Sequence, residues 1–230
     1  MKYFLAPFAV LAVCIALRVI SLSVQLSKSG YGESSGNSVW NLLFNKGNYG
    51  EFLTYRILEK NGENRILCNV YLPKSNEETT EIDLISVNRK GIFVYESKNY
   101  SGWIFGDEKS RTWTQSLKGG TKNKFFNPIF QNKGHISAIN KYLDGEYKDC
   151  FVSYIVFSER CELKKVSVNS EKTRVINRQR LSASLNDDKN NLPDVLTDEE
   201  AEAIYSKLKT KTLVSDSVKE EHIKAIKNRK

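Results

Sequence analysis

The chain opens with a long apolar run. Residues 3–26 are aliphatic, aromatic or small apart from a few polar positions, and Arg18 is their one charged side chain. About 20 apolar residues are enough for a helix to cross a bilayer. Arg18 lies towards the C-terminal end of the run, where a long side chain reaches the interface. We therefore expect residues 1–26 to form a transmembrane anchor. The rival interpretation is a cleaved signal peptide, for which Ser21-Leu-Ser23 offers a weak cleavage site.

Polar residues follow the apolar run. The segment 27–44 begins with a stretch rich in Gly and Ser, which is typical of a flexible linker. A globular domain is expected over residues 45–160. Residues 161–230 are expected to form a C-terminal extension with strands and terminal helices.

Apolar positions within the globular part repeat with helical or strand periodicity. Helical spacing predicts helices at 48–60 and 129–143, and the capping box Thr197-Asp-Glu-Glu200 predicts the start of a helix that runs through about Lys209. Apolar or alternating runs predict strands at 65–72, 81–87, 91–98, 101–107, 111–115 and 149–157, with weaker strands at 165–168 and 172–176. The polar segment 119–128 is expected to be a loop, and residues 214–230 a loose terminal helix.

One predicted hairpin contains charged residues within its apolar strands. Asp83 lies on the first strand, and Glu96 and Lys98 lie two residues apart on the second, after the turn Asn88-Arg-Lys-Gly91. Period-two geometry places Glu96 and Lys98 on the same face. If strand pairing brings Asp83 beside them, two carboxylates and an ammonium group converge, and such oxygen ligands suit Mg²⁺ or Mn²⁺.

The alternative for this hairpin is a solvated strand face with a local ion pair. The strand residues 92–95 are continuously apolar, which is typical of a strand buried on both faces. Charges at the end of such a strand are costly unless they are paired or bound to a metal. The pattern therefore favours a functional site.

Five ordered pieces of the chain resemble the nuclease-related domain (NERD) branch of the PD-(D/E)XK nuclease superfamily. They are Gly47-Asn-Tyr-Gly-Glu51, Glu81-Ile-Asp83, Tyr95-Glu-Ser-Lys-Asn99, a hairpin rich in Gly and Trp, and Asn127-Pro-Ile-Phe-Gln131. The resemblance covers roughly residues 45–160. It implies a restriction-endonuclease-like α/β fold, in which a mixed sheet is flanked by helices, and metal-dependent cleavage of DNA.

The resemblance also implies roles for individual residues. Asp83 and Glu96 would hold the metal, Glu51 would join them directly or through water, and Lys98 would serve the nucleophile or stabilise charge in the transition state. Gln131 would orient a phosphate or a water. The ordinary interpretations remain open: Glu51 is also a first-turn acid that the helix dipole favours, and Gln131 is also an exposed helix residue.

A basic and aromatic segment precedes Gln131. Lys118, Lys122 and Lys124 could hold phosphates, and Phe125 and Phe126 could stack on bases. The alternative is that the two phenylalanines fix this segment to the core while the lysines are solvated.

Three further side chains receive structural interpretations. Trp103 and Trp113 are expected to form a cross-strand packing pair on the second hairpin, rather than a base-stacking platform. His135 follows Gln131 by one helical turn. We expect it to be a surface or partly packed residue, although contact with a phosphate is possible.

Charge and cysteine content indicate which partners the protein binds and in which cellular compartment it lies. The chain has 230 residues and a net charge of +8, with an isoelectric point near 9.2. This charge favours DNA or an anionic membrane as partner, although positive-inside anchoring and solubility would also explain it. Cys68, Cys150 and Cys161 form an odd set outside the anchor, which suits a reducing compartment. Two histidines are too few to support a His-based zinc site or a Ser-His-Asp triad.

The sequence therefore predicts a single-pass membrane protein with a cytoplasmic, Mg²⁺- or Mn²⁺-dependent nuclease domain acting on DNA. The rival is a non-catalytic module that binds nucleic acid or protein with a nuclease-like fold. A third possibility is an extracytoplasmic protein, released by signal cleavage.

Overall fold

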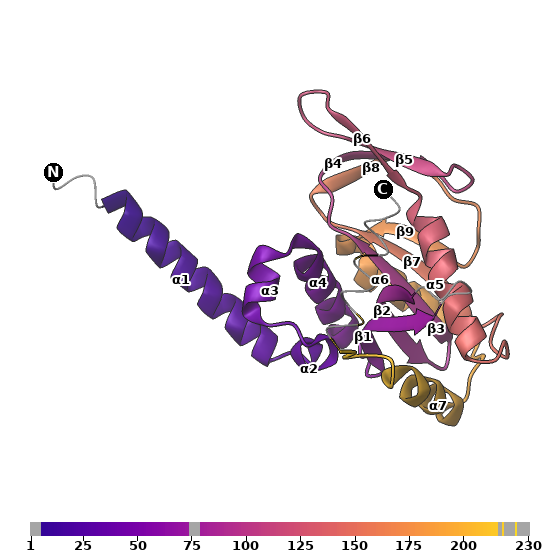
Figure 1. Cartoon of the computed structure of the whole chain (residues 1–230). Coiled ribbons are helices and arrows are strands. Elements are labelled where there is room, and N and C mark those ends of the chain that lie inside the picture. Colours follow the sequence, from indigo (N-terminus) through magenta and orange to yellow (C-terminus); the bar gives the residue numbers. More distant parts are fainter. Residues whose placement is uncertain (1–5, 74–78, 216–217, 219–223, 225–230) are drawn as a thin grey trace.

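The computed structural model describes residues 6–73, 79–215, 218 and 224. Two mixed β-sheets are flanked by helices, and a long N-terminal helix projects away from them (Figure 1). The helices are α1 (Ala6–Ser27), α2 (Tyr31–Ser35), α3 (Val39–Phe44), α4 (Lys46–Lys60), α5 (Pro128–Tyr142), the 3₁₀ turn η1 (Arg178–Arg180), α6 (Leu181–Asn191) and α7 (Asp198–Lys209). The strands are β1 (Ile66–Pro73), β2 (Thr79–Asn88), β3 (Gly91–Lys98), β4 (Gly102–Asp107), β5 (Thr112–Ser116), β6 (Lys122–Phe126), β7 (Phe151–Phe157), β8 (Cys161–Ser167) and β9 (Thr173–Asn177).

The main sheet has the order β1-β2-β3-β7-β9. Strands β1, β2 and β3 pair antiparallel in sequence order, whereas β7 pairs parallel with β3, and β9 pairs parallel with β7. One face packs on α4 through residues such as Phe52 and Leu58. The other face packs on α5 and α7, through residues such as Ile139 and Ile204. A sheet covered on both faces explains the continuous apolar runs of β3 and β7, and it confirms the predicted α/β class.

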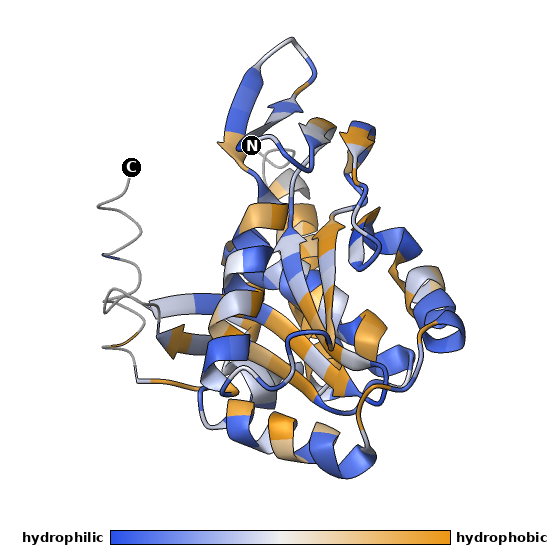
Figure 2. Cartoon of the chain, turned by 90° about the vertical axis from the view of Figure 1, so that its right-hand side faces the viewer, coloured by the Kyte–Doolittle hydropathy of each residue, from blue (hydrophilic) through white to orange (hydrophobic). Residues whose placement is uncertain are grey.

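The second sheet has the order β6-β5-β4-β8 and forms a smaller lobe beside the end of the main sheet (Figure 1). Its projecting hairpin is largely hydrophilic in Figure 2, whereas apolar residues dominate the central strands of the main sheet. Trp113 is buried here and stacks on Phe157 of β7, with ring centroids 6.1 Å apart. This aromatic contact joins the two sheets.

Two expectations for this lobe are wrong. Residues 119–128 are not a simple loop, because β6 pairs with β5 from Lys122 to Phe126. Nor do the two tryptophans form a cross-strand pair: Trp103 lies opposite Ser116, and Trp113 lies opposite Phe125. The register between β4 and β5 separates the two tryptophans, because it places Trp103 opposite Ser116, three residues after Trp113.

The segment expected to be a flexible linker instead contains α2 and α3. Tyr31 is fully buried, and its ring lies 5.4 Å from those of both Phe52 and Tyr55. Ser38 caps α3 with a reciprocal capping box. The Gly and Ser residues therefore serve as turns and caps around a buried aromatic anchor.

The last turns of α1 belong to the folded domain. Leu22 is only 3% exposed and packs in the same core cluster as α4. The stretch Phe8–Ser27 is long and apolar enough to cross a membrane, and nearly all of it is exposed. Beside α1, Trp40 and Phe44 of α3 stack on each other and are 60% and 83% exposed.

The expected boundary at residue 160 does not separate structural units. Strand β8 completes the second sheet by pairing with β4, and β9 completes the main sheet by pairing with β7. Helix α7, predicted from its capping box, covers β1 and β2, while α6 was not predicted. The expected terminal helix over 214–230 falls largely outside the described residues.

Candidate active site

The site forms where β2 and β3 part. Their ladder runs from Asn88–Gly91 to Leu84–Tyr95 and then stops, while β3 continues alongside β7 as far as Lys98. Asp83 is the first residue of β2 beyond this ladder. Its Oδ2 accepts a hydrogen bond of 2.9 Å from the backbone N–H of Ser97, which bridges the opening.

An irregularity in the neighbouring strand coincides with this opening. The β1–β2 ladder contains Cys68–Leu84 and Val70–Ile82 but skips Asn69 and Asp83 between them. Asn69 has a positive φ of 50°, which is uncommon for a residue with a side chain. Cys68 and Leu84 pack on the α4 side, whereas Val70 and Ile82 pack on the α5 side. The side-chain alternation therefore reverses at Asp83, while the register of the ladder is unchanged because one residue is skipped on each strand.

Glu96 and Lys98 project together from the end of β3, as their spacing predicts. Glu96 Oε1 lies 2.6 Å from Lys98 Nζ, and the carboxylate is only 2% exposed. Lys98 Nζ also donates to Gln131 Oε1 at 3.0 Å. Gln131 lies in the first turn of α5, which Asn127 caps through the N–H of Ile129. The Asn127-Pro128 cap thus aims the Gln131 amide at the lysine.

His135 was expected to be a surface or partly packed residue, and this expectation is wrong, because it is buried beside Glu96. It is buried on α5, and its Nε2 lies 3.0 Å from Glu96 Oε2. Its Nδ1 lies 3.0 Å from Thr80 Oγ1 of β2. A carboxylate accepts only, so Nε2 carries the proton in this contact. The spacing of four residues between Gln131 and His135 was the available signal, because it places both on one helical face.

Glu51 approaches from the other layer of the fold, on α4. Tyr31 Oη lies 3.5 Å from its Oε2, so the segment expected to be a linker contributes to the site. The preceding residue, Gly50, allows α4 to come close to β3, since a Cβ there would be 3.2 Å from Cβ of Asn99. Arg178 fixes this approach by donating to the Gly50 carbonyl at 2.9 Å.

Two of the acids are strongly perturbed. Burial, and then the charges of Glu81 and Glu96, raise the pKa of Glu51 to about 8. Burial, followed by the charges of Glu96 and Glu51, holds the pKa of Asp83 well above its usual value. These causes show that the carboxylates are close enough to repel one another in a poorly solvated place.

The Glu96–Lys98 pair titrates in the opposite sense. Burial acts to raise the pKa of Glu96, but the charge of Lys98 and the hydrogen bond from His135 outweigh it, so the pKa is lowered. Burial likewise opposes the charge on Lys98, but Glu96 and Asp83 raise its pKa above the usual value. At neutral pH Glu96 is therefore an anion and Lys98 a cation, whereas Glu51, with a pKa of about 8, largely retains its proton.

The donors suit a hard divalent cation. Among the described residues no group of three or more His, Cys, Asp or Glu side chains is close enough to form a ready-made metal cage. Mg²⁺ does not require one, because it binds through one or two carboxylates and keeps several waters. A cluster of acids whose mutual repulsion raises their pKa values is chemically matched to a cation that relieves it.

The three predicted nucleic-acid lysines lie elsewhere. Lys118 follows β5, and Lys122 and Lys124 lie on β6, all of them exposed. Phe125, which follows Lys124, packs with Trp113, so the core interpretation holds for this phenylalanine. Phe126 is about half exposed. The lysines thus belong to the second sheet, whereas the acids belong to the main sheet and α4.

Comparison with known proteins agrees with this geometry. The family model described as nuclease-related domain matches residues 46–158. The chain belongs to the nuclease-related domain family. It is also 34% identical over 187 residues to an uncharacterized protein of Bacillus anthracis, an alignment that covers 80% of this chain and 85% of that protein. No solved structure matches the chain. The nuclease-related domain match includes all five residues of the predicted site.

Proposed function

We propose that this nuclease-related protein is a membrane-anchored nuclease that hydrolyses phosphodiester bonds in DNA with Mg²⁺ or Mn²⁺. The observation that supports this most is the convergence of Asp83, Glu96, Lys98 and Gln131 at the opening between β2 and β3. A buried lysine that is held between a carboxylate and an amide, beside acids with raised pKa values, is more than a surface ion pair requires.

Asp83 and Glu96 are the residues that would hold the metal, with Glu51 contributing directly or through water. The bound metal would neutralise phosphate charge and lower the pKa of water. Asp83 is oriented by the Ser97 N–H, and Glu96 by His135. The acids are thus fixed before substrate arrives, which limits the reorganisation that catalysis requires.

Lys98 has a separate task in this proposal. Its raised pKa keeps it protonated, so it enters the reaction as a hydrogen-bond donor with a positive charge. Such a group stabilises the negative charge that builds on a phosphate oxygen and orients an attacking water. Gln131 holds Nζ at 3.0 Å and keeps the lysine from swinging out to solvent.

A cleavage assay tests this proposal. Full-length protein in detergent is incubated with linear, circular and single-stranded DNA, with Mg²⁺, Mn²⁺ or EDTA. Cleavage that requires metal and disappears in Lys98→Ala, but not in Lys141→Ala, supports the nuclease. Lys141 is the matched control because it is an exposed lysine at the other end of α5. Binding of DNA without cleavage by any of these metals would instead favour the non-catalytic module.

The membrane part of the proposal rests on α1 and α3. The exposed apolar surface of α1 continues onto Trp40 and Phe44, and aromatic residues favour the membrane interface. Arg18 stacks over the Tyr49 ring at 5.6 Å, on the side where the domain begins. Full-length protein is therefore expected to remain with membranes after carbonate extraction.

We place the domain in the cytoplasm, where DNA and free thiols are found. Cys150 is the useful reporter, because Cys68 and Cys161 are buried and Cys14 lies in α1. An impermeant maleimide should label Cys150 only after cells are permeabilised, with Cys150→Ser as the control. Labelling in intact cells would contradict this orientation.

A further inference from the structure

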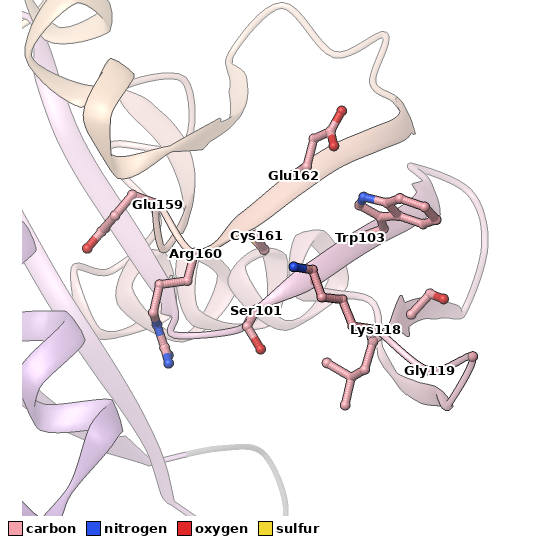
Figure 3. Close-up of a pocket in the computed structure, with 12 residues that line it drawn as sticks. Ser101, Trp103, Lys118, Gly119, Glu159, Arg160, Cys161 and Glu162 are labelled. Atoms are coloured by element: carbon pink, nitrogen blue, oxygen red, sulfur yellow. The ribbon is translucent and has the colours of Figure 1, made fainter.

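A pocket of about 800 Å³ lies on the second sheet, at the edge where β4 meets β8 (Figure 3). The turn between β5 and β6 forms its outer wall. The side chains that matter here are Trp103, Lys118 and Arg160, which surround the opening. None of them belongs to the carboxylate site.

Trp103 offers an exposed ring to this pocket. It is 50% exposed, whereas Trp113 on the next strand is 1% exposed. The residue opposite Trp103 is Ser116, so no aromatic partner covers the ring across the strands. Lys164 Nζ lies 5.5 Å from the centre of the ring. An exposed aromatic ring flanked by a cation is suited to stacking on a nucleobase.

The pocket also has an excess of positive charge. Its two acids are already neutralised, since Glu159 pairs with Arg178 at 2.6 Å and Glu162 pairs with Lys164 at 3.0 Å. Within the described part of the chain, neither Lys118 nor Arg160 forms a salt bridge with an acid, although the charge of Arg160 also acts on Glu159. These two cations are therefore available to an anion such as a phosphate.

Hydrogen bonds connect the pocket directly to the candidate active site. Arg160 Nη2 donates to the carbonyl of Asn99 at 2.8 Å and to its side-chain oxygen at 2.9 Å. The N–H of Ser158 donates to the Lys98 carbonyl at 2.9 Å. The segment that leaves Lys98 thus becomes the pocket wall at Ser101 within three residues. The pocket therefore lies next to the segment that follows Lys98.

We propose that this pocket binds an unpaired nucleotide of single-stranded DNA, with the base stacked on Trp103 and phosphates held by Lys118 and Arg160. This inference rests on the proposed nuclease function and gives it a substrate class, namely DNA with a single-stranded segment such as a frayed end or a flap. A base within a duplex is already stacked on its neighbours, so it does not present a free face to the ring.

Equilibrium binding tests the pocket without any cleavage. Full-length protein in detergent with EDTA is titrated with an oligo-dT strand and with a blunt hairpin duplex. Trp103→Ala should weaken oligo-dT binding about tenfold or more, because stacking on an aromatic residue contributes that much per base. Duplex binding should stay unchanged, and Trp103→Phe should restore part of the loss because it keeps a ring.

The matched control is Tyr205→Ala, which removes a partly exposed ring that likewise has a lysine, Lys209, 5.5 Å from its centre but lies on α7, outside the pocket. It should bind oligo-dT like the wild type. Equal binding of oligo-dT by wild type and Trp103→Ala would overturn the proposal. Tighter binding of an oligo-U strand than of oligo-dT would overturn the assignment to DNA.

Cleavage separates this proposal from the nuclease itself. If the wild type cuts DNA and Trp103→Ala cuts tailed and blunt substrates equally well, the pocket is wrong and the nuclease stands. If nothing is cut but oligo-dT binding depends on Trp103, the nuclease is wrong and the pocket stands. Loss of activity confined to tailed substrates supports both.

Discussion

The two sheets of this protein differ in how much of their surface is buried. The main sheet is covered on both faces, and its polar cluster occurs where the ladder between β2 and β3 ends. The second sheet has a largely polar outer strand, β6, and a half-exposed tryptophan on β4. Buried acids gain perturbed pKa values from low solvation, whereas exposed lysines and rings are free to meet a large ligand. In our proposal the main sheet therefore carries the catalytic residues, and the second sheet carries the residues that bind DNA.

The largest expected effect concerns Lys98, in the polar cluster of the main sheet. Lys98→Ala should reduce the cleavage rate by about 10²-fold or more, because groups that serve the nucleophile typically contribute this much. DNA binding in EDTA should change little, since one phosphate contact among several is lost. Single-turnover rates and equilibrium binding measure the two effects separately. Unchanged cleavage by Lys98→Ala would mean that the activity comes from another site or a contaminant.

The next effect concerns the joint between the sheets. A Cβ at Gly106 would lie 2.1 Å from the Trp113 ring, which stacks on Phe157. Gly106→Val should therefore destabilise the protein by about 1–3 kcal/mol or more through overpacking. Denaturant unfolding measures the loss, with Gly134→Ala on α5 as a control, because a Cβ there meets nothing within 4 Å. Wild-type stability of Gly106→Val would show that the aromatic joint does not hold the lobe in place.

A smaller effect concerns the pH dependence of the acid cluster. The folded pKa of Glu51 is raised to about 8, so the folded state binds more protons than the unfolded state between about pH 4.5 and 8. Stability in EDTA should therefore fall as pH rises through this window. Melting temperatures at pH 5.5 and 8.5 should differ less in Glu51→Gln than in the wild type. The control is Glu146→Gln, an exposed acid beyond α5.

Binding of a metal ion to the same acid cluster should stabilise the folded protein, whereas a rise in pH without metal should destabilise it. A cation that binds the folded state stabilises it by mass action. Mg²⁺ or Mn²⁺ should raise the melting temperature more at pH 8.5 than at pH 5.5, because the acids must lose protons to bind it. An equal shift in Asp83→Asn and wild type would place the metal elsewhere.

The smallest expected effect concerns the exposed lysines of β6. Lys122→Ala and Lys124→Ala should each weaken DNA binding modestly and reduce the salt dependence by about one counterion. Sequence preference and the cleavage rate of bound DNA should not change. Binding isotherms at several salt concentrations test this, and a flat response would remove β6 from the DNA-binding surface.

The sequence predicted the main sheet well because its strands are buried on both faces. The apolar runs of β3 and β7 leave little choice of structure, and the spacing of Glu96 and Lys98 fixes their common face. The motif predicted that Gln131 belongs to the site, but its hydrogen bond to Lys98, 33 residues away in the sequence, was not predicted. The strand pattern is local in the sequence, so the sequence contains most of the information about these strands.

The rest depended on tertiary contacts that a linear pattern does not contain. The reversal of side-chain alternation at Asn69 and Asp83 leaves no compositional mark. His135 joins the site only because α5 lies across the end of β3. Tyr31 turned a Gly- and Ser-rich segment into folded structure by entering the aromatic core. In each of these places, tertiary packing determined the structure and overrode the local preference of the sequence.

The docking of Leu22 and Leu26 against the domain core has a consequence for how a substrate is found. No flexible linker separates α1 from the main sheet, because α2 and α3 are folded between them. If α1 spans the bilayer as we propose, the domain is held at a fixed distance from the membrane and does not move on a flexible tether. Encounters would then depend on diffusion of the nucleic acid to the membrane. A long, mobile nucleic acid that comes close to the membrane would meet the site more often than one that stays far from it.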